Sequence, residues 1–403
     1  MSLESYQVLQ RNAQNEAVIG ENGETLTLKA GGPYQVGAAH DVLVGDLWVL
    51  AGQSNMEGCG DLVDLETPDP LVHSFQSMET WAVAEEPLHW LGCSPRVIHH
   101  NLWGQATVPN PLPGKDPYRT KGSGLALTFA KILSGRTGVP IGLIPSAHGG
   151  TSMQQWSPKL RDKGGASLYG ATIERIKANG GKAAGILWYQ GESDANPDDV
   201  RRYDERMTEL VNAFRSDLGQ PDLPFYIVQL GVFINDGAGG GSESWTAIRE
   251  LQRTWTAKTP NTGLVAAIDL GLDDAIHIGT AGLKTLGKRF ADVVSGQPSP
   301  DVLSVRFEDG VTKIRVTYKN VRGGLISGGV PSGYSIRTAK GTEIAAIFKT
   351  QLDGDSAVLH LDGGERTLGS YLYYGYGMYP YANITDVEGA AIPAFGPIRL
   401  YGC

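Results

Sequence analysis

The residues with the clearest chemistry are one serine near the start of the chain and one histidine far beyond it. Ser54 lies in the segment GQSNM (52–56), and a serine hydroxyl becomes a nucleophile when a base removes its proton. His277 is a candidate for that base. Asp274 precedes His277 by three residues, a spacing at which a carboxylate can orient the imidazole. These residues predict acyl transfer, with Ser54 as nucleophile, His277 as general base and Asp274 as orienting acid.

Two more segments carry groups that could stabilise the negative charge of an acyl-transfer intermediate. Gly149 and Gly150 let the backbone approach a reacting carbonyl closely, so their N–H groups can donate to an oxyanion. Gln190 can add a side-chain amide, and the Ser54 backbone amide is a further donor. Each segment alone has a plainer interpretation, as a helix cap, a tight turn, a solvated acidic loop or a surface Asp–His pair. Their combination favours catalysis.

The elements that must position these residues are predicted from the hydrophobic pattern. Five near-continuous apolar runs are typical of strands buried on both faces of a parallel sheet, and helical patterns alternate with them. This alternation predicts a doubly wound α/β sheet. The strands are expected at 46–53, 139–145, 183–189, 223–230 and 262–270, and the helices at 124–134, 167–178, 198–217, 244–258 and 282–294.

The candidate residues follow the expected strands. Ligands of a doubly wound sheet bind beyond the carboxyl ends of the strands. Ser54 follows the first strand, the glycine pair follows the second, Gln190 follows the third, and the Asp–His pair follows the fifth. The sequence has no G-x-S-x-G segment, which disfavours the α/β-hydrolase arrangement. We therefore expect one site at one edge of the sheet.

Three regions of different pattern divide the chain. Residues 1–45 contain short β-prone pieces, and we expect them to pack on another domain by joining or covering the C-terminal β region. Residues 46–296 carry the α/β pattern of a catalytic domain, interrupted by a long insertion at 57–121 that is either functional or structural. After a linker rich in Pro, Gly and Ser, alternating strands at 300–403 predict a β-sandwich-like accessory domain.

Four segments together resemble the sequence blocks of the SGNH hydrolases. They are GQSNM (52–56), IPSAHGGTSMQQW (144–156), LWYQGESDA (187–195) and DDAIHIGTAGLKTLGKRFA (273–291). The most similar branch contains carbohydrate acetylesterases, namely the sialate O-acetylesterases and carbohydrate esterase family 6, which includes acetyl xylan esterases. The resemblance covers about residues 46–294, and the tail YANITDVEGAAIPAFGPIRL is similar to the end of the β domain in sialate O-acetylesterases. It implies a flavodoxin-like catalytic domain with an accessory all-β domain.

The resemblance implies the same catalytic roles that the residue types suggest. Gln190 stands where the superfamily usually has Asn, and it would complete an oxyanion hole with the Ser54 amide and the Gly149–Gly150 turn. Glu192 matches the motif of this branch, and we assign it to substrate binding or site support. The same assignment is made for Gln53, Asn55 and Trp156.

Three further features near the blocks have two interpretations each. Trp156 could stack on a sugar ring or belong to the core or rim. His148 could contact substrate, although a satisfied loop histidine is favoured. The glycine run at 237–241 could form a mobile rim loop or an ordinary linker.

Charge and hydropathy disfavour several classes of partner. Lys and Arg number 34 and Asp and Glu 43, which gives a net charge of −9 and no basic surface for a nucleic acid or an anionic membrane. No run of eighteen apolar residues predicts a membrane span. The opening MSLESYQVLQRN lacks signal-peptide features. We therefore expect a soluble protein that is cytoplasmic, or secreted or periplasmic after removal of a signal.

Cysteines and histidines do not suggest a metal site. Three cysteines give neither a disulfide framework nor a C-x-x-C pair, so unrelated thiols are favoured and a bridge between Cys59 and Cys93 stays open. His89, His99 and His100 lack the spacing of a zinc set. We expect no metal and no cofactor.

The sequence therefore predicts a metal-independent serine esterase that removes O-acetyl groups from a carbohydrate through an acetyl-enzyme. Its expected substrate is an acetylated xylan-type oligosaccharide or an O-acetylated sialic acid. A lipase or thioesterase for longer acyl chains is the alternative among esterases, although the polar strand ends suggest no apolar acyl groove. A non-catalytic carbohydrate-binding or structural protein is the alternative from another class. The oligomeric state is not predicted.

Overall fold

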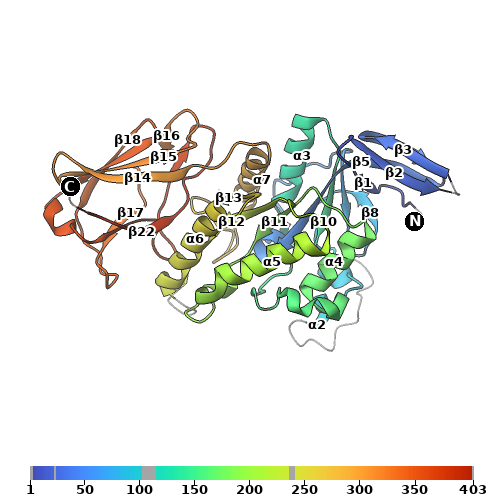
Figure 1. Cartoon of the computed structure of the whole chain (residues 1–403), viewed down its shortest axis with the longest axis horizontal. Coiled ribbons are helices and arrows are strands. Elements are labelled where there is room, and N and C mark those ends of the chain that lie inside the picture. The colour runs from blue at the N-terminus through green and yellow to red at the C-terminus, as the bar shows by residue number, and fades with distance from the viewer. Residues whose placement is uncertain (1–2, 22–23, 102–114, 236–240, 402–403) are drawn as a thin grey trace. The chain divides into compact units, whose positions relative to one another are not determined.

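The computed structural model describes residues 3–21, 24–101, 115–235 and 241–401 (Figure 1). The chain packs as two compact units, each built from three segments. The first unit contains Met1–Ser193, Glu205–Tyr226 and His277–Ala291, and the second contains Asp194–Asp204, Ile227–Ile276 and Asp292–Cys403. The domain limits expected from the sequence, at residues 46, 296 and 300, stay predictions.

The sheet of the first unit is built around one long strand. β5 (Ala39–Gly52) has β10 (Ile141–Pro145) and β11 (Gly185–Tyr189) as parallel neighbours on its two sides. Every residue of β10 and β11 is buried, as expected for strands covered on both faces. Beyond β10 follow β7 (Val72–Phe75), which is parallel to it, and β8 (Trp81–Val83), which is antiparallel to β7. The predicted α/β fold with a parallel sheet is confirmed.

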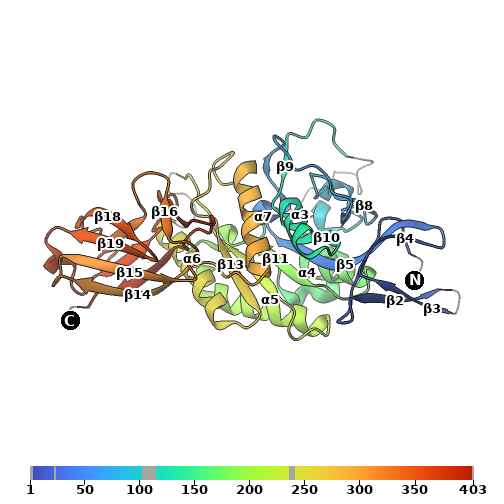
Figure 2. The ribbon, with the colours of Figure 1, turned by 90° about the horizontal axis from the view of Figure 1, so that it is seen from above.

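The N-terminal segment joins this sheet. β1 (Val8–Gln10) pairs with β5 in parallel, and β4 (Gly31–Val36) pairs with it antiparallel. The expectation that these strands join or cover the C-terminal β region is wrong, because β5 begins at Ala39 and its first half provides their pairing edge. β2 (Glu16–Glu21) and β3 (Glu24–Lys29) form a hairpin that lies near β4 in the view of Figure 2.

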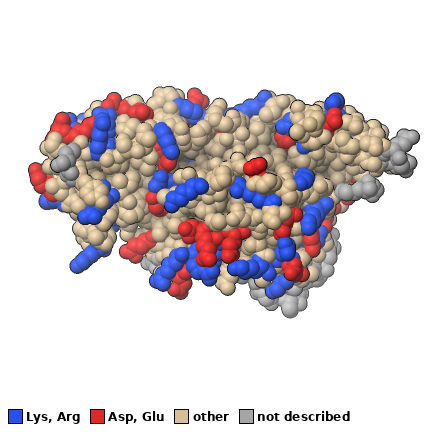
Figure 3. All heavy atoms as spheres, viewed as in Figure 1, with Lys and Arg blue, Asp and Glu red and all other residues tan. Residues whose placement is uncertain are grey.

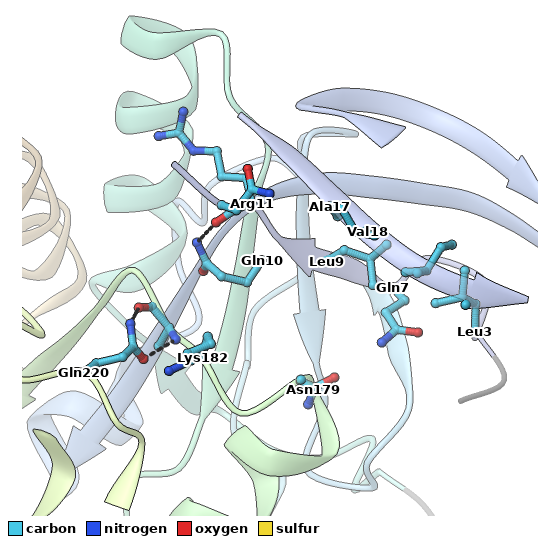
Figure 4. Close-up of a pocket in the computed structure, with 15 residues that line it drawn as sticks. Leu3, Gln7, Leu9, Gln10, Arg11, Ala17, Val18, Asn179, Lys182 and Gln220 are labelled. Carbon is cyan, nitrogen blue, oxygen red and sulfur yellow. Dashed lines mark hydrogen bonds between the residues drawn. The ribbon is translucent and has the colours of Figure 1, made fainter. Parts of the chain in front are cut away.

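A pocket of about 620 Å³ lies between this N-terminal segment and the body of the first unit (Figure 4). Its lining includes β1, β2 and the turn from Asn179 to Ala183. Gln220 holds the turn, since its Nε2 donates to Ala183 O at 2.9 Å and its Oε1 accepts from the Ala183 N–H at 3.1 Å. Because Ala183 precedes β11, this pocket lies at the amino end of that strand and not where the catalytic residues are expected.

The insertion at 57–121 contains elements of its own. It contributes β7 and β8 to the main sheet and takes part in a separate small pair of strands. Sequence reasoning missed β7 because polar His73 and Ser74 interrupt its apolar run, although both are buried and the His73 ring bonds to Tyr6 O at 2.7 Å. The separate pair consists of β6 (Gly60–Asp61) and β9 (Lys121–Ser123). The other elements are two short turns, η1 (Leu91–Cys93) and α2 (Ile98–Asn101).

All five predicted helices are present. They are α3 (Ala126–Thr137), α4 (Leu168–Ala178), α5 (Tyr203–Asp217), α6 (Gly241–Lys258) and α7 (Thr280–Val294). The shorter helical segments are α1 (Ser54–Glu57), η2 (Pro158–Ala166), η3 (Glu192–Asp194) and η4 (Val200–Arg202).

No helix in the described part of the chain combines the length and hydropathy of a membrane-spanning segment. On the face shown in Figure 3, acidic and basic side chains are interspersed.

The C-terminal part of the second unit is all-β. Its strands form the antiparallel sheets β14-β15-β19-β18 and β17-β20-β22 and the pair β16-β21. Ile314, Val316, Leu372 and Tyr374 belong to one buried core that these sheets share. The predicted accessory all-β domain is confirmed. The strand bounds are β14 (Asp301–Glu308), β15 (Lys313–Lys319), β16 (Leu325–Ser327), β17 (Tyr334–Arg337), β18 (Ile347–Asp353), β19 (Ser356–Leu361), β20 (Tyr371–Tyr374), β21 (Ile384–Asp386) and β22 (Phe395–Arg399), with η5 (Gly364–Thr367) between β19 and β20.

One buried arginine joins α6 to this β region within the second unit. Arg249 is fully buried, and its guanidinium donates to backbone carbonyls on two separate segments. One segment follows β12 (Phe225–Gln229), the strand that precedes β13 (Thr262–Ala266), and the other follows β20. The acceptors are Leu230 O at 3.0 Å, Gly231 O, Gly375 O at 3.1 Å, Gly377 O at 2.5 Å and Met378 O at 3.3 Å.

Candidate active site

The predicted nucleophile lies at the switch point of the sheet. Because β10 and β11 flank β5 on opposite sides, the carboxyl end of β5 is the position at which a sheet of this kind binds ligands. β5 ends at Gly52, and Ser54 begins the short helix α1 directly after it. Ser54 is partly exposed, whereas its neighbours Gln53 and Asn55 are buried. Ser54 is therefore an accessible hydroxyl at the position where this fold binds ligands.

Gly52 allows β5 to end beside β11. Its φ of +127° lies in the region that favours glycine, and a Cβ there would stand 2.2 Å from Tyr189 O. The next residue donates its N–H to the same oxygen at 2.8 Å. The turn that carries Ser54 is thereby fixed over the end of β11, one residue before Gln190.

The Gly149–Gly150 turn lies against the Ser54 turn. The His148 N–H donates to Gly52 O at 3.1 Å, which anchors the start of the turn to the end of β5. A Cβ built on Gly149 would lie 3.4 Å from Ser54 Cβ. Gly150 is exposed and has a φ of +67°. The structure thus brings together the two segments expected to hold the nucleophile and the oxyanion.

Gln190 is fully buried beneath the same turn. Its Nε2 donates to Thr151 O at 3.1 Å, so Gln190 supports the chain directly after the glycine pair. The structure therefore places Gln190 beside the turn as expected, and its role as an oxyanion donor stays a prediction.

Glu57 is a residue of this site that sequence reasoning missed. Its Oε2 accepts the Gly149 N–H at 2.7 Å. Burial raises the pKa of Glu57 to about 7, against the opposing effects of the Gly149 hydrogen bond and the charge of Arg119. The available signal was its position on α1, three residues after Ser54 and therefore on a neighbouring face of the helix. Gly149 can donate to an oxyanion only if this carboxylate releases its N–H.

Asn55 links the segment after Ser54 to two distant parts of the first unit. Its Nδ2 donates to Glu192 Oε1 at 2.9 Å, and its Oδ1 accepts the Ile278 N–H at 3.0 Å. The residue after Ser54 therefore binds the residue after His277. This bond places His277 at the same edge of the sheet as Ser54.

Gln53 completes the network around Glu192. With its amide oriented as the surrounding hydrogen-bond partners require, the Gln53 side-chain nitrogen faces Thr151 O at 3.1 Å and Glu192 Oε2 at 3.2 Å. The geometry favours site support for Gln53, Asn55 and Glu192, because their polar groups bind protein atoms. Asp274 is exposed, and its Oδ1 accepts the Ile276 N–H at 3.0 Å in the turn before His277.

Trp156 lies in the core, so the sugar-stacking interpretation is wrong. It is fully buried, packs edge-on against Trp188 at a centroid distance of 5.2 Å, and donates from Nε1 to Thr151 Oγ1 at 3.0 Å. A ring without exposed surface cannot contact a substrate. Trp156 supports the site from below by fixing Thr151.

Histidines of the insertion pack on the Gly149–Gly150 turn. The His99 and His148 rings stack at a centroid distance of 5.1 Å, with their Nδ1 atoms 2.9 Å apart. Burial lowers the pKa of His148 to about 4 and that of His99 well below its ordinary value, so both imidazoles are neutral. One of the two Nδ1 atoms carries a hydrogen and donates it to the other. His89 accepts the Ala147 N–H at 3.2 Å through Nε2. His148 is thus a satisfied loop histidine, and the insertion braces the turn.

The remaining expectations concern metals, thiols and the rim loop. Among the residues that the structure describes, no three His, Cys, Asp or Glu side chains converge as a metal site requires. Cys59 and Cys93 do not form a disulfide. The predicted rim loop at 237–241 lies, except for Gly241, outside the described residues.

A second buried carboxylate of the first unit makes stability depend on pH. Glu86 is 8% exposed and accepts from the Gly124 N–H at 2.8 Å. Burial raises its pKa to about 7 from 4.5, so the folded chain holds a proton that the unfolded chain has lost between these values. The stabilisation that the raised pKa of Glu86 adds to the free energy of unfolding is complete below pH 4.5 and is lost as the pH rises through 7.

Glu86→Gln is expected to flatten this pH dependence, since Gln can still accept the Gly124 N–H but does not ionise. Between pH 4.5 and 8, the unfolding free energy of the unmodified protein should fall relative to that of the variant by on the order of 3 kcal/mol. Native-state amide hydrogen exchange in the first unit, compared between the two proteins at each pH, measures the difference. Parallel curves would show that Glu86 titrates normally in the folded protein.

Comparison with known proteins agrees with this geometry. Residues 44–295 match the family described as "Carbohydrate esterase, sialic acid-specific acetylesterase". The chain is 29% identical to the "Probable carbohydrate esterase" of Arabidopsis thaliana over 61% of its own length and 88% of that protein. It is 26% identical to human sialate O-acetylesterase over 60% of its length, a match that spans only 53% of that relative.

One solved structure covers nearly the whole chain. A carbohydrate acetylesterase from Xanthomonas citri is 25% identical, with a TM-score of 0.70 over 98% of this chain and 97% of that one. The likeness includes both the α/β sheet and the accessory β region. This chain therefore belongs to the sialic acid-specific acetylesterase family of carbohydrate esterases, and it is a carboxylic ester hydrolase.

Proposed function

We propose that the enzyme removes O-acetyl groups from a carbohydrate through an acetyl-enzyme on Ser54. The observation that carries this proposal is the convergence of the Ser54 turn, the Gly149–Gly150 turn and the segment of His277 at the switch point, joined by the Asn55–Ile278 hydrogen bond. The carbohydrate substrate follows from the family and from the names of its members.

The proposed reaction has two displacement steps. His277 takes the Ser54 proton while Oγ attacks the acetyl carbon, and Asp274 keeps the imidazole in the required orientation. The tetrahedral intermediate expels the sugar oxygen, which receives the proton from His277. Water then attacks the acetyl-enzyme with His277 again as base, and acetate leaves.

The oxyanion is assigned to donors around Ser54. The Ser54 N–H, the Gly150 N–H and the Gln190 amide are the proposed set. Gly149 joins this set when Glu57 gives up its N–H. A negative charge on Glu57 beside the oxyanion would oppose catalysis, so the protonated form of Glu57 is the more favourable one.

The substrate is tested by acetate release from acetylated xylan and from O-acetylated sialic acid, measured side by side. We expect acetate from at least one of them, and equal inertness toward both would contradict the carbohydrate assignment. A series of p-nitrophenyl esters from C2 to C8 tests the acyl group. Preference for acetate supports the proposal, whereas preference for C8 would identify the alternative lipase or thioesterase.

A further inference from the structure

A second hollow lies within the second unit, among residues that the proposed reaction does not use. It has a volume of about 770 Å³ and is lined by one face of α6, the loop Thr338–Gly341 and three tyrosines. We call it the tyrosine hollow, after Tyr371, Tyr373 and Tyr376.

The tyrosines point away from the β core by strand alternation. Along β20, Leu372 and Tyr374 are buried in the core, whereas Tyr371 and Tyr373 are partly exposed on the opposite face. Tyr376 follows in the next turn and meets Tyr373 edge-on, with ring centroids 5.1 Å apart at 77°. Two aromatic rings therefore stand nearly perpendicular to each other in the wall of one hollow.

The Tyr376 ring is held in place by its neighbours. The Arg337 guanidinium lies 3.6 Å from the ring centroid, and Arg337 is itself fixed by Glu343 Oε2 at 2.7 Å and Gly341 O at 2.9 Å. On the other wall, α6 is tied to the same turn, since the Gly377 N–H donates to Thr246 Oγ1 at 2.8 Å. The hollow is thus formed before any ligand binds, which lowers the ordering cost of binding.

The polar groups of the hollow select among ligand classes. Glu250 is paired with Arg253 at 2.6 Å, and Arg337 is paired with Glu343. The charges of Glu243 and Lys340, which also belong to the lining, cancel, so the lining has no net charge that would attract an anion. Phenol hydroxyls and carboxylates beside aromatic rings suit a molecule with apolar C–H faces and many hydroxyl groups. That combination describes a pyranose ring.

We propose that the tyrosine hollow binds a neutral oligosaccharide, as a second carbohydrate site apart from the esterase chemistry. The choice of a carbohydrate rests in part on the proposed function. The neutral character rests on the lining itself, which separates this ligand from an anionic sugar such as a sialic acid.

The test uses unacetylated xylohexaose and cellohexaose, which the esterase reaction cannot consume. Isothermal titration calorimetry of the full chain should show saturable binding of at least one of them. Tyr376→Ala and Tyr373→Ala should each weaken this binding about tenfold, because each removes a stacking ring. Tyr376→Phe should retain it, since the ring remains.

Tyr401→Ala is the matched control, because Tyr401 is an exposed tyrosine of the same unit that also lies under an arginine, Arg399. It should bind as the unmodified protein does. The proposal would be overturned if neither oligosaccharide saturated the protein, or if Tyr376→Ala bound them as tightly as the unmodified protein does. Tighter binding of 3′-sialyllactose than of the two neutral oligosaccharides would also overturn it. Turnover of p-nitrophenyl acetate should be equal in all four variants, and its absence from the unmodified protein would instead count against the proposed function.

Discussion

Replacing Ser54 with alanine is expected to lower p-nitrophenyl acetate turnover by about 10³-fold or more. The substitution removes the attacking oxygen but keeps the Cβ that lies near Gly149. It also keeps the Ser54 carbonyl, which accepts the Gly58 N–H at 2.9 Å and closes α1. The loss should therefore appear in kcat with an unchanged fold, which circular dichroism and thermal unfolding can verify.

Ser157→Ala is a suitable control for the loss of a serine hydroxyl. Ser157 caps η2 through a hydrogen bond to the Lys159 N–H, so its removal should cost about 1 kcal/mol of stability and leave turnover intact. Turnover in Ser54→Ala within tenfold of the unmodified enzyme would exclude Ser54 as the nucleophile.

Replacing Arg249 with methionine is expected to destabilise the second unit by about 3–5 kcal/mol. Methionine fills part of the volume but donates no hydrogen bonds, so five backbone carbonyls after β12 and β20 would lose their buried donor. The guanidinium contact with the Trp245 ring, at 6.0 Å, would also be lost.

Because the chain contains two units, amide hydrogen exchange is the appropriate measurement. Exchange of the β15 and β20 amides should accelerate in Arg249→Met under native conditions. Arg306→Met is the matched control: its side chain is 65% exposed and pairs with Glu308 at the surface, so exchange should stay close to that of the unmodified protein. Equal protection in the two variants would show that Arg249 is not needed to hold α6 to the β region.

The parts of the fold that the sequence could predict are those with a local signal. The runs IGLIP and GILWY form β10 and β11 because nearly every residue in them is apolar, and the polar turns after them mark the strand ends. β7 has no such signal. His73 and Ser74 become strand residues only when β10 provides a partner and Tyr6 O a hydrogen-bond acceptor.

The contacts that organise the candidate site could not be predicted because they join residues far apart in the chain. The Asn55–Ile278 bond spans 223 residues and the Glu57–Gly149 bond spans 92, and neither has a fixed spacing in sequence. The burial of Trp156 could not be predicted for another reason. An aromatic residue beside a catalytic motif looks the same in sequence whether its ring faces a ligand or the core.

The segmental build of the two units has a consequence for synthesis on the ribosome. Each unit consists of three segments, and the first is completed only by His277–Ala291. A nascent chain therefore presents Ser54, the Gly149–Gly150 turn and Gln190 long before the proposed base emerges. During this interval the proposed base is not available to activate the nucleophile, and only the two shorter segments of the second unit, Asp194–Asp204 and Ile227–Ile276, are translated. We expect the enzyme to gain activity late in translation, and no single proteolytic cut can release either unit intact.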